Sequence, residues 1–179
     1  MVASHSLQRM YRRPGFLLKR CHQVAMAIFL EECQAYAITQ SQYGCLRALQ
    51  EYPGIDQIAL GRLVGLDRST AGLVIKALSE RRLIERVINR ADKRRMRLKM
   101  SAEGERLLRT IAPAAARAQN RVLQGLPRKL HAVFLDMLES FLAGHGALID
   151  VDEVLAPSLP ANDLNKRTRP RKARRTHPL

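Results

Sequence analysis

DQIALGRLVGLDRSTAGLVIKALSERRLIERVINRADKRRMRLK, residues 56–99, is the stretch that decides the fold. Asp56 and Asp67 each precede apolar residues spaced three and four apart, and a carboxylate in that place can cap the first turn of a helix. Gly65 separates the two repeats and permits a tight turn. The stretch therefore predicts a short helix, a turn and a second helix. The apolar side expected for the short helix consists of Ile58, Leu60, Leu63 and Val64.

The second helix, expected from Arg68 to about Arg81, has one buried side and one free side. Its buried stripe repeats at helical spacing through Ala71 and Leu78. The free side is slim and opens with a positive charge and hydroxyl groups, as a helix that enters the major groove of DNA requires. We expect the following residues to face the groove: Arg68, Ser69, Thr70, Gly72, Leu73 and Lys76.

Two strand-like segments follow, at about 83–89 and 95–100, with a polar turn between them. Basic side chains crowd this hairpin, and Asp92 is the single acid of its turn. A basic two-stranded ribbon beside a groove-reading helix is a winged helix. We expect Arg90, Arg94 and Arg95 to meet phosphates or to enter the minor groove, where a narrow A·T tract attracts arginine.

Four short segments resemble the MarR family of bacterial transcription regulators, and the likeness in architecture extends over roughly 14–148. They are LDRST at 66–70, LSERRLIER at 78–86, DKRR at 92–95 and SAEG at 101–104. In that family a D-x-R element lies in the wing. The resemblance implies that Asp92 braces the wing while Arg94 meets DNA.

The chain departs from the family pattern at two positions. Arg82 stands where glycine usually ends the recognition helix, which bears on how tightly that helix can end. Leu73 stands where a polar or basic residue is common, which indicates an apolar contact such as one to a thymine methyl, or simply a different operator.

The composition favours a helical protein with a polyanionic partner. The 179 residues are 46% hydrophobic and 4% aromatic, and the formal net charge is +15. No apolar run reaches the roughly 18 residues of a membrane span, and the N-terminus lacks a secretory apolar region, so we expect a cytoplasmic protein. Cys21, Cys33 and Cys45 form no CxxC pair, so neither a disulfide framework nor a zinc site is indicated, and no cofactor is expected.

We expect a mainly α fold with a small β-hairpin wing. Long apolar stripes on the helices before and after the DNA-binding unit would stay partly bare in a monomer, so a homodimer is expected. Two-fold symmetry would set the recognition helices about 34 Å apart on a pseudo-palindromic operator in double-stranded DNA. The expected segments are a flexible N-terminus (1–13), a winged-helix domain (14–148) and a basic, disordered tail (149–179). Within the domain they are the helix-turn-helix (56–81), the wing (83–100) and dimerisation helices (14–37, 101–124 and 127–148).

Many regulators of the family bind aromatic acids or their thioesters between the dimerisation helices and the DNA-binding unit. Phe16, Arg20, His22 and Tyr43 would make an aromatic and cationic pocket suited to a carboxylate or an acyl-CoA. That hypothesis extends to control of aromatic-compound degradation. The alternative for His22 is an ordinary structural histidine on the helix.

Other interpretations stay open. Cys21 lies between Arg20 and His22, so it is either a redox sensor or a plain buried cysteine. The tail after Asp163 carries seven basic residues and either binds DNA or only solubilises the chain. A basic architectural protein that binds DNA without sequence preference is the second hypothesis for the whole chain. An enzyme is not expected, because no catalytic triad order, Gly-rich phosphate loop or metal-ligand cluster is present.

Overall fold

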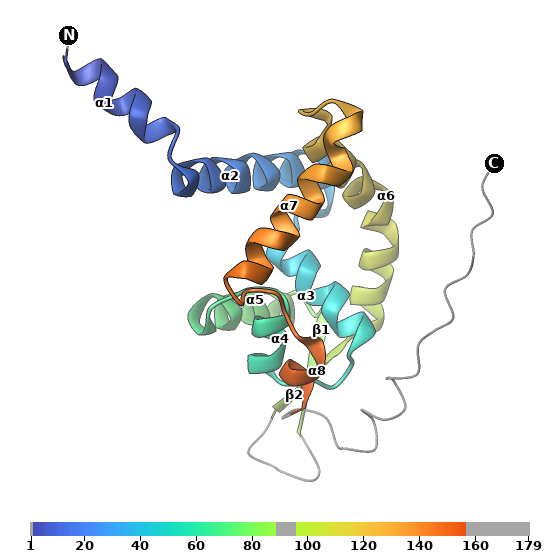
Figure 1. Cartoon of the computed structure of the whole chain (residues 1–179). Helices are drawn as coiled ribbons and strands as arrows, with labels where there is room; N and C mark the ends of the chain where they lie inside the picture. Colours follow the sequence, from blue (N-terminus) through green and yellow to red (C-terminus); the bar gives the residue numbers. More distant parts are fainter. Residues whose placement is uncertain (1, 89–95, 157–179) are drawn as a thin grey trace, which may run out of the picture.

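The computed structural model describes residues 2–88 and 96–156, and it is a mainly helical winged helix (Figure 1). Its elements are α1 (Val2–Tyr11), α2 (Pro14–Cys33), a 3-10 turn (Gln34–Tyr36), α3 (Gln40–Glu51), α4 (Gln57–Leu63), α5 (Arg68–Glu80), β1 (Ile84–Ile88), β2 (Met96–Met100), α6 (Ala102–Gln124), a second 3-10 turn (Arg128–Leu130), α7 (His131–Gly144) and α8 (Val151–Leu155).

The helices begin where the sequence supplies a capping side chain. The Thr39 hydroxyl accepts the backbone N–H of Gln42, and the Gln42 side chain accepts the N–H of Thr39, which completes a capping box at α3. Asp56 accepts two N–H groups of α4, and Ser101 accepts the N–H of Gly104 at α6. The predicted caps at α3, α4 and α6 are therefore confirmed.

The core of the DNA-binding unit lies where α3, α5, β2 and α6 meet. Leu46, Ile75, Leu98 and Ile111 come from these four elements in turn, and each is at most 2% exposed. Burial of such side chains is the main source of folding free energy in the unit. The core therefore fixes the orientation of α5 relative to the hairpin.

The hairpin is an antiparallel pair in which Ile84 lies opposite Met100 and Ile88 lies opposite Met96. On its other edge β2 is joined by Ile55, whose carbonyl accepts the N–H of Leu98 at 2.9 Å. This register turns Leu98 into the core while its neighbour Lys99 stays exposed. The two strands predicted from composition are confirmed over the described residues, and β1 begins at Ile84, one residue after the predicted start.

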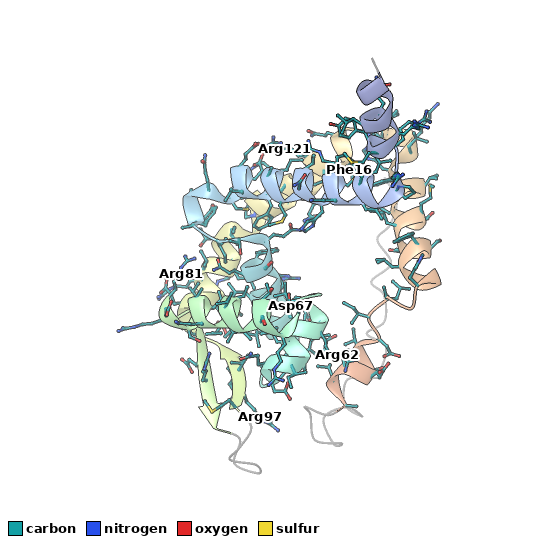
Figure 2. All side chains as sticks on the ribbon, turned by 90° about the vertical axis from the view of Figure 1, so that its left-hand side faces the viewer. Phe16, Arg62, Asp67, Arg81, Arg97 and Arg121 are labelled. Atoms are coloured by element: carbon teal, nitrogen blue, oxygen red, sulfur yellow. The ribbon has the colours of Figure 1, made fainter. Side chains whose placement is uncertain are left out.

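α2 and α6 pack side by side and carry the DNA-binding unit on one flank (Figures 1 and 2). Between them the Glu32 carboxylate accepts from Arg121 at 2.8 Å and from Arg117 at 2.9 Å. The hydrogen bond from Arg121 has the largest effect on the pKa of Glu32 and that from Arg117 the second largest, and both hold this pKa below its usual value. These pairs are local ties between the two long helices.

α6 is one continuous helix with Pro113 inside it, where a kink or a split was expected. Proline removes the backbone donor that would bond the carbonyl four residues earlier, which bends a helix without ending it. Figure 1 shows the ribbon of α6 changing direction along its length. The helix is therefore bent and is not divided.

Both ends of the described chain hold helices that the sequence did not predict. α1 lies within 1–13, where a flexible segment was expected, and α8 lies within 149–179, where a disordered tail was expected. The five residues of α8 are too few to show an apolar period, and the helix is held by burial of Val154 and Leu155. Over the described ranges, no helix has both the length and the apolar character that crossing a bilayer requires.

Candidate nucleic-acid interface

α4 and α5 form the helix-turn-helix, and two glycines allow their close approach. Gly61 lies against Ala71, so that a Cβ built on Gly61 would be 3.0 Å from the Ala71 Cβ. Gly65 has φ of +67° in the turn, a conformation that other residues rarely adopt. The Leu66 N–H closes the turn on the Gly61 carbonyl at 2.9 Å. α5 is thereby held at a fixed angle to α4.

Asp67 caps α5, as predicted, and it engages one residue twice. One carboxylate oxygen accepts the Thr70 N–H at 2.9 Å, and the other accepts the Thr70 hydroxyl at 2.6 Å. The hydrogen bond from the Thr70 side chain, followed by that from its backbone, keeps the pKa of Asp67 below its usual value. The carboxylate therefore stays ionised where the helix dipole favours a negative charge.

Four of the six predicted groove-facing residues are exposed on α5. Arg68, Ser69, Leu73 and Lys76 lie open to solvent, and Leu73 is 71% exposed although it is a large apolar residue. Lys76 makes only a loose contact of 3.8 Å with a glutamate one turn on, so its charge remains available.

The other two predicted residues, Thr70 and Gly72, are half-buried. The hydroxyl of Thr70 donates to Asp67, which leaves it only as an acceptor toward DNA. A Cβ on Gly72 would lie 3.5 Å from the Gln57 amide nitrogen, so this glycine sits against α4. Both residues shape the start of the recognition helix more than its outer face.

Sequence reasoning missed the contribution of α4 to this surface. Ile58 was placed on the apolar side that faces the core, yet it is 64% exposed. A groove of about 280 Å³ runs between α4 and the first turn of α5, and it brings together Ile58, Arg62 and Arg68. The error has a simple cause, because a seven-residue helix offers too few residues for its periodicity to define the buried side.

The predicted wing residues Arg90, Asp92, Arg94 and Arg95 lie outside the described residues. The described strands keep Arg86 and Lys99 exposed on the same hairpin. Their positive charges lie beside α5, in keeping with a basic ribbon next to the recognition helix.

The end of α5 is tight although glycine is absent there. Arg82 has φ of +55°, its N–H reaches the Ser79 carbonyl at 2.9 Å, and the Leu83 N–H reaches the Leu78 carbonyl at 2.9 Å. This pair of bonds is a Schellman motif with arginine in the usual glycine position. The Ser101 hydroxyl then donates to the Arg82 carbonyl at 2.7 Å. The recognition helix therefore ends tightly without glycine, because Arg82 itself adopts the left-handed conformation.

The recognition helix is also fastened to the start of the DNA-binding unit. Arg81 donates to the backbone carbonyls of Tyr36 and Ala37, which lie in the turn between α2 and α3 (Figure 2). This side chain therefore ties the end of α5 to the turn that follows α2.

A cleft of about 730 Å³ lies between α2, α3 and the turn that joins α4 to α5. Its size is within the usual range for small-molecule sites. Polar and apolar groups line it together, among them His22 and Met26 from α2, Arg47 from α3 and Thr70 from α5. The cleft thus touches a long helix, the DNA-binding unit and the first turn of the recognition helix.

Of the four predicted effector residues, the structure places only His22 in this cleft. Phe16 packs against Tyr11 with ring centroids 5.2 Å apart, and Tyr43 packs against Phe29 at 5.5 Å. Arg20 donates to the Gln23 side chain at 3.0 Å on the surface of α2. The grouping of four is therefore not what the fold brings together, and Arg47 is the cation that sequence reasoning missed.

The cysteines are dispersed. Cys21 is exposed on α2, while Cys33 and Cys45 are buried. Burial raises the pKa of the Cys45 thiol to about 12 and also raises that of Cys33. Among the described side chains, no group of histidine, cysteine and carboxylate residues is arranged to hold a metal ion.

Comparison with known proteins agrees with this geometry. The model of the MarR family matches residues 38–96. The transcriptional regulator HosA of Escherichia coli is 28% identical over 105 residues, which cover 59% of this chain and 78% of HosA. The regulator PcaV of Streptomyces coelicolor is 33% identical, with a TM-score of 0.64 over 76% of this chain and 99% of PcaV.

A third relative has been solved with nucleic acid. The repressor CouR bound to a 23-mer DNA duplex is 25% identical to this chain, with a TM-score of 0.67 over 74% of this chain and 94% of CouR. Winged-helix architecture, an exposed recognition helix and these likenesses lead to one conclusion: the chain belongs to the MarR family of DNA-binding transcriptional regulators.

Proposed function

We propose that this regulator binds a pseudo-palindromic operator as a homodimer and changes its grip when a small effector binds. The observation that carries the proposal is the outer face of α5. Arg68, Ser69, Leu73 and Lys76 stand exposed on a helix whose opposite side is buried in the core. Such a face provides a cation, a hydroxyl and an apolar group for base edges and phosphates. Arg90, Arg94 and Arg95 would serve the wing, braced by Asp92.

Support for a homodimer comes from apolar surface on the long helices. None of the residues of α7 is buried, and large apolar side chains are exposed on both α2 and α7. Exposed apolar surface of this extent is typical of an interface between subunits. The exposed apolar side chains are Leu17, Leu18, Val24, Met26 and Leu30 on α2, and Val133, Leu135, Met137, Phe141 and Leu142 on α7. We propose that residues 14–148 form the winged-helix domain of each subunit in this dimer.

The effector site is proposed to be the cleft between α2, α3 and the turn before α5. Arg47 can bind a carboxylate or phosphate, His22 can donate or accept, and Met26 offers apolar surface to a ring. These groups suit an aromatic acid or its CoA thioester, and control of aromatic-compound degradation would follow. PcaV has been solved in complex with its natural ligand, and the chain in that complex is 32% identical to this one. Occupation of the cleft would shift α2 against α5, and a coupling of about 1–3 kcal/mol would suffice.

The test is binding to promoter DNA that the protein itself protects from nuclease. Arg68→Glu should weaken binding to that duplex by about thirtyfold or more, because each lost groove contact costs about 1–3 kcal/mol and a dimer loses two. Arg12→Glu is the matched control. It reverses the same charge at an exposed position beside α1, at the opposite end of the molecule from the hairpin (Figure 1).

Two results would contradict the proposal. The first is a single subunit by light scattering at the concentrations used for binding. The second is an Arg68→Glu variant that holds the promoter as firmly as the parent. A parent chain that binds scrambled duplex equally well would favour the architectural protein instead, because a specific regulator discriminates by roughly a thousandfold or more.

A further inference from the structure

The chain after α7 returns to the DNA-binding unit, where α8 docks on α4 (Figure 1). Val154 and Leu155 of α8 join the hydrophobic core and are only 5% and 2% exposed. Asp150 caps the helix by accepting the Glu153 N–H at 3.1 Å. A helix of five residues does not persist on its own, so these contacts decide where its exposed residues lie.

The docking brings a carboxylate of α8 to an arginine of the helix-turn-helix. Oε1 of Glu153 lies 3.6 Å from Nη2 of Arg62, which is a residue of α4. Figure 2 shows Arg62 on the part of α4 that α8 approaches. Both side chains are at least half exposed, so the pair adds little stability and a competing anion can replace the carboxylate.

Arg62 also belongs to the surface assigned to DNA. It lines the groove between α4 and the first turn of α5 together with Arg68. Arg68 is the first residue of the recognition helix and is proposed to contact the duplex. Phosphates border the groove that such a helix enters, so a duplex seated on Arg68 brings phosphates toward Arg62.

Glu153 and a DNA phosphate therefore compete for one guanidinium group. The segment around Glu153 is acidic as a whole, because residues 145–156 contain three carboxylates and no lysine or arginine. A docked acidic segment at the edge of a DNA-binding surface repels an approaching polyanion. Both effects lower the affinity for DNA while α8 is docked.

We propose that α8 is an autoinhibitory element of the helix-turn-helix, in which Glu153 holds Arg62 and a DNA phosphate must displace it. The inference rests on the proposed function, since it requires duplex DNA on α5. When a phosphate takes Arg62, it releases a counterion, whereas the freed Glu153 takes up a cation from solution. The two terms offset each other, so Glu153 conceals the contribution of Arg62 to the salt dependence of binding.

The first experiment removes the charge of Glu153 and keeps its size. Affinity is measured by fluorescence anisotropy over a series of salt concentrations, on the protected promoter duplex and on a scrambled duplex of equal length. Glu153→Gln should tighten binding at low salt by about two- to tenfold, because an exposed ion pair shifts an equilibrium only a few-fold and a dimer carries two. Its log–log salt slope should be steeper by about 0.9 per subunit.

Asp152→Asn is the matched control. Asp152 is the neighbouring residue, is exposed on the same helix and loses the same charge, but it is not the carboxylate that Arg62 contacts. Its affinity and its salt slope should stay close to those of the parent. Substitutions at these exposed positions should leave the fold intact, which the melting temperature of each variant checks.

The second experiment completes a double-mutant cycle with Arg62→Gln. This variant should bind both duplexes more weakly than the parent, because it loses a phosphate contact. In the Arg62→Gln background, Glu153→Gln should change affinity no more than Asp152→Asn does. A coupling between the two positions is the signature of direct competition for Arg62.

Three results would overturn the proposal. In the first, Glu153→Gln and Asp152→Asn tighten binding equally, so that only net charge matters. In the second, the effect of Glu153→Gln persists without Arg62. In the third, Glu153→Gln weakens binding, which would make α8 a support of the DNA-binding surface. The proposed function is judged separately, by the parent's preference for promoter over scrambled duplex. The cycle acts through phosphates, so it should give the same ratios on both duplexes.

Discussion

Arg82 holds a left-handed backbone conformation, with φ of 55°, at the end of the recognition helix. A side chain in that conformation costs about 1–2 kcal/mol, and glycine avoids the cost but loses more entropy on folding. Arg82→Gly should therefore raise the free energy of unfolding by about 0.5–1 kcal/mol. Urea unfolding at one fixed protein concentration measures this change, because the stability of the proposed dimer would depend on concentration.

Lys76→Gly is the control for Arg82→Gly, since it also replaces a long basic side chain but lies within α5. It should lower the free energy of unfolding by about 1 kcal/mol. If Arg82→Gly leaves stability unchanged or lowers it, the left-handed conformation carries no strain worth relieving.

Single residues were predictable where their partners are near in sequence. Asp56 and Asp67 cap helices through N–H groups two or three residues ahead, and such contacts follow from local pattern alone. The proposed effector residues were not predictable in the same way. Phe16 packs against Tyr11 and Tyr43 packs against Phe29, whereas Arg47 lines the cleft. The cleft is formed by tertiary packing, which the sequence pattern does not specify.

At the scale of elements, the junction of hairpin and α6 depends on Gly104. A Cβ on Gly104 would lie 2.2 Å from the Leu83 carbonyl oxygen and 2.8 Å from a side-chain carbon of Met100. The Leu83 carbonyl cannot move freely, because it accepts the Ser101 N–H at 3.1 Å. Gly104→Ala should destabilise the fold by about 1–3 kcal/mol. Calorimetry should show a melting temperature several degrees below that of the parent.

Gly125→Ala provides the matched control for that junction. Gly125 ends α6 with φ of −67°, and nothing lies within 4 Å of the Cβ that it would gain. Its melting temperature should equal or slightly exceed that of the parent. Equal melting temperatures of the Gly104→Ala variant and the parent would mean that α6 can shift away from Leu83 and Met100 without cost.

The existence of the long helices followed from the sequence, whereas α8 and the orientation of α4 did not. α2, α3, α5 and α6 have enough turns for an apolar period and a cap to agree. α8 has five residues, and only its burial against α4 distinguishes it from a loop. The orientation of α4 failed for the same reason, since the exposure of Ile58 is decided by what packs around the helix.

At the scale of the whole molecule, the sequence supported a DNA-binding unit between long helices, and the fold adds the cleft that joins them. The cleft has α2 on one side and Thr70 of the recognition helix on the other. Thr70 is tied to Asp67, the cap of α5. A ligand in the cleft would therefore contact both the proposed dimer helices and the start of the helix that reads DNA.

The last prediction concerns this cleft. The protein should be titrated with benzoate, hydroxycinnamates and their CoA thioesters. At least one of these compounds should raise the melting temperature of the protein and change the affinity of the protein for promoter DNA by about 5- to 150-fold. Arg47→Gln should weaken binding of that compound by about tenfold or more, because it removes a charge-assisted hydrogen bond worth about 1.5–3 kcal/mol. Arg20→Gln is the matched control, since Arg20 lies on the outer surface and bonds to Gln23. Equal weakening by both variants would relocate the site toward α2, and no response to any compound would contradict an aromatic effector. The two arginines thus decide between the pocket expected from sequence spacing and the pocket formed by the fold.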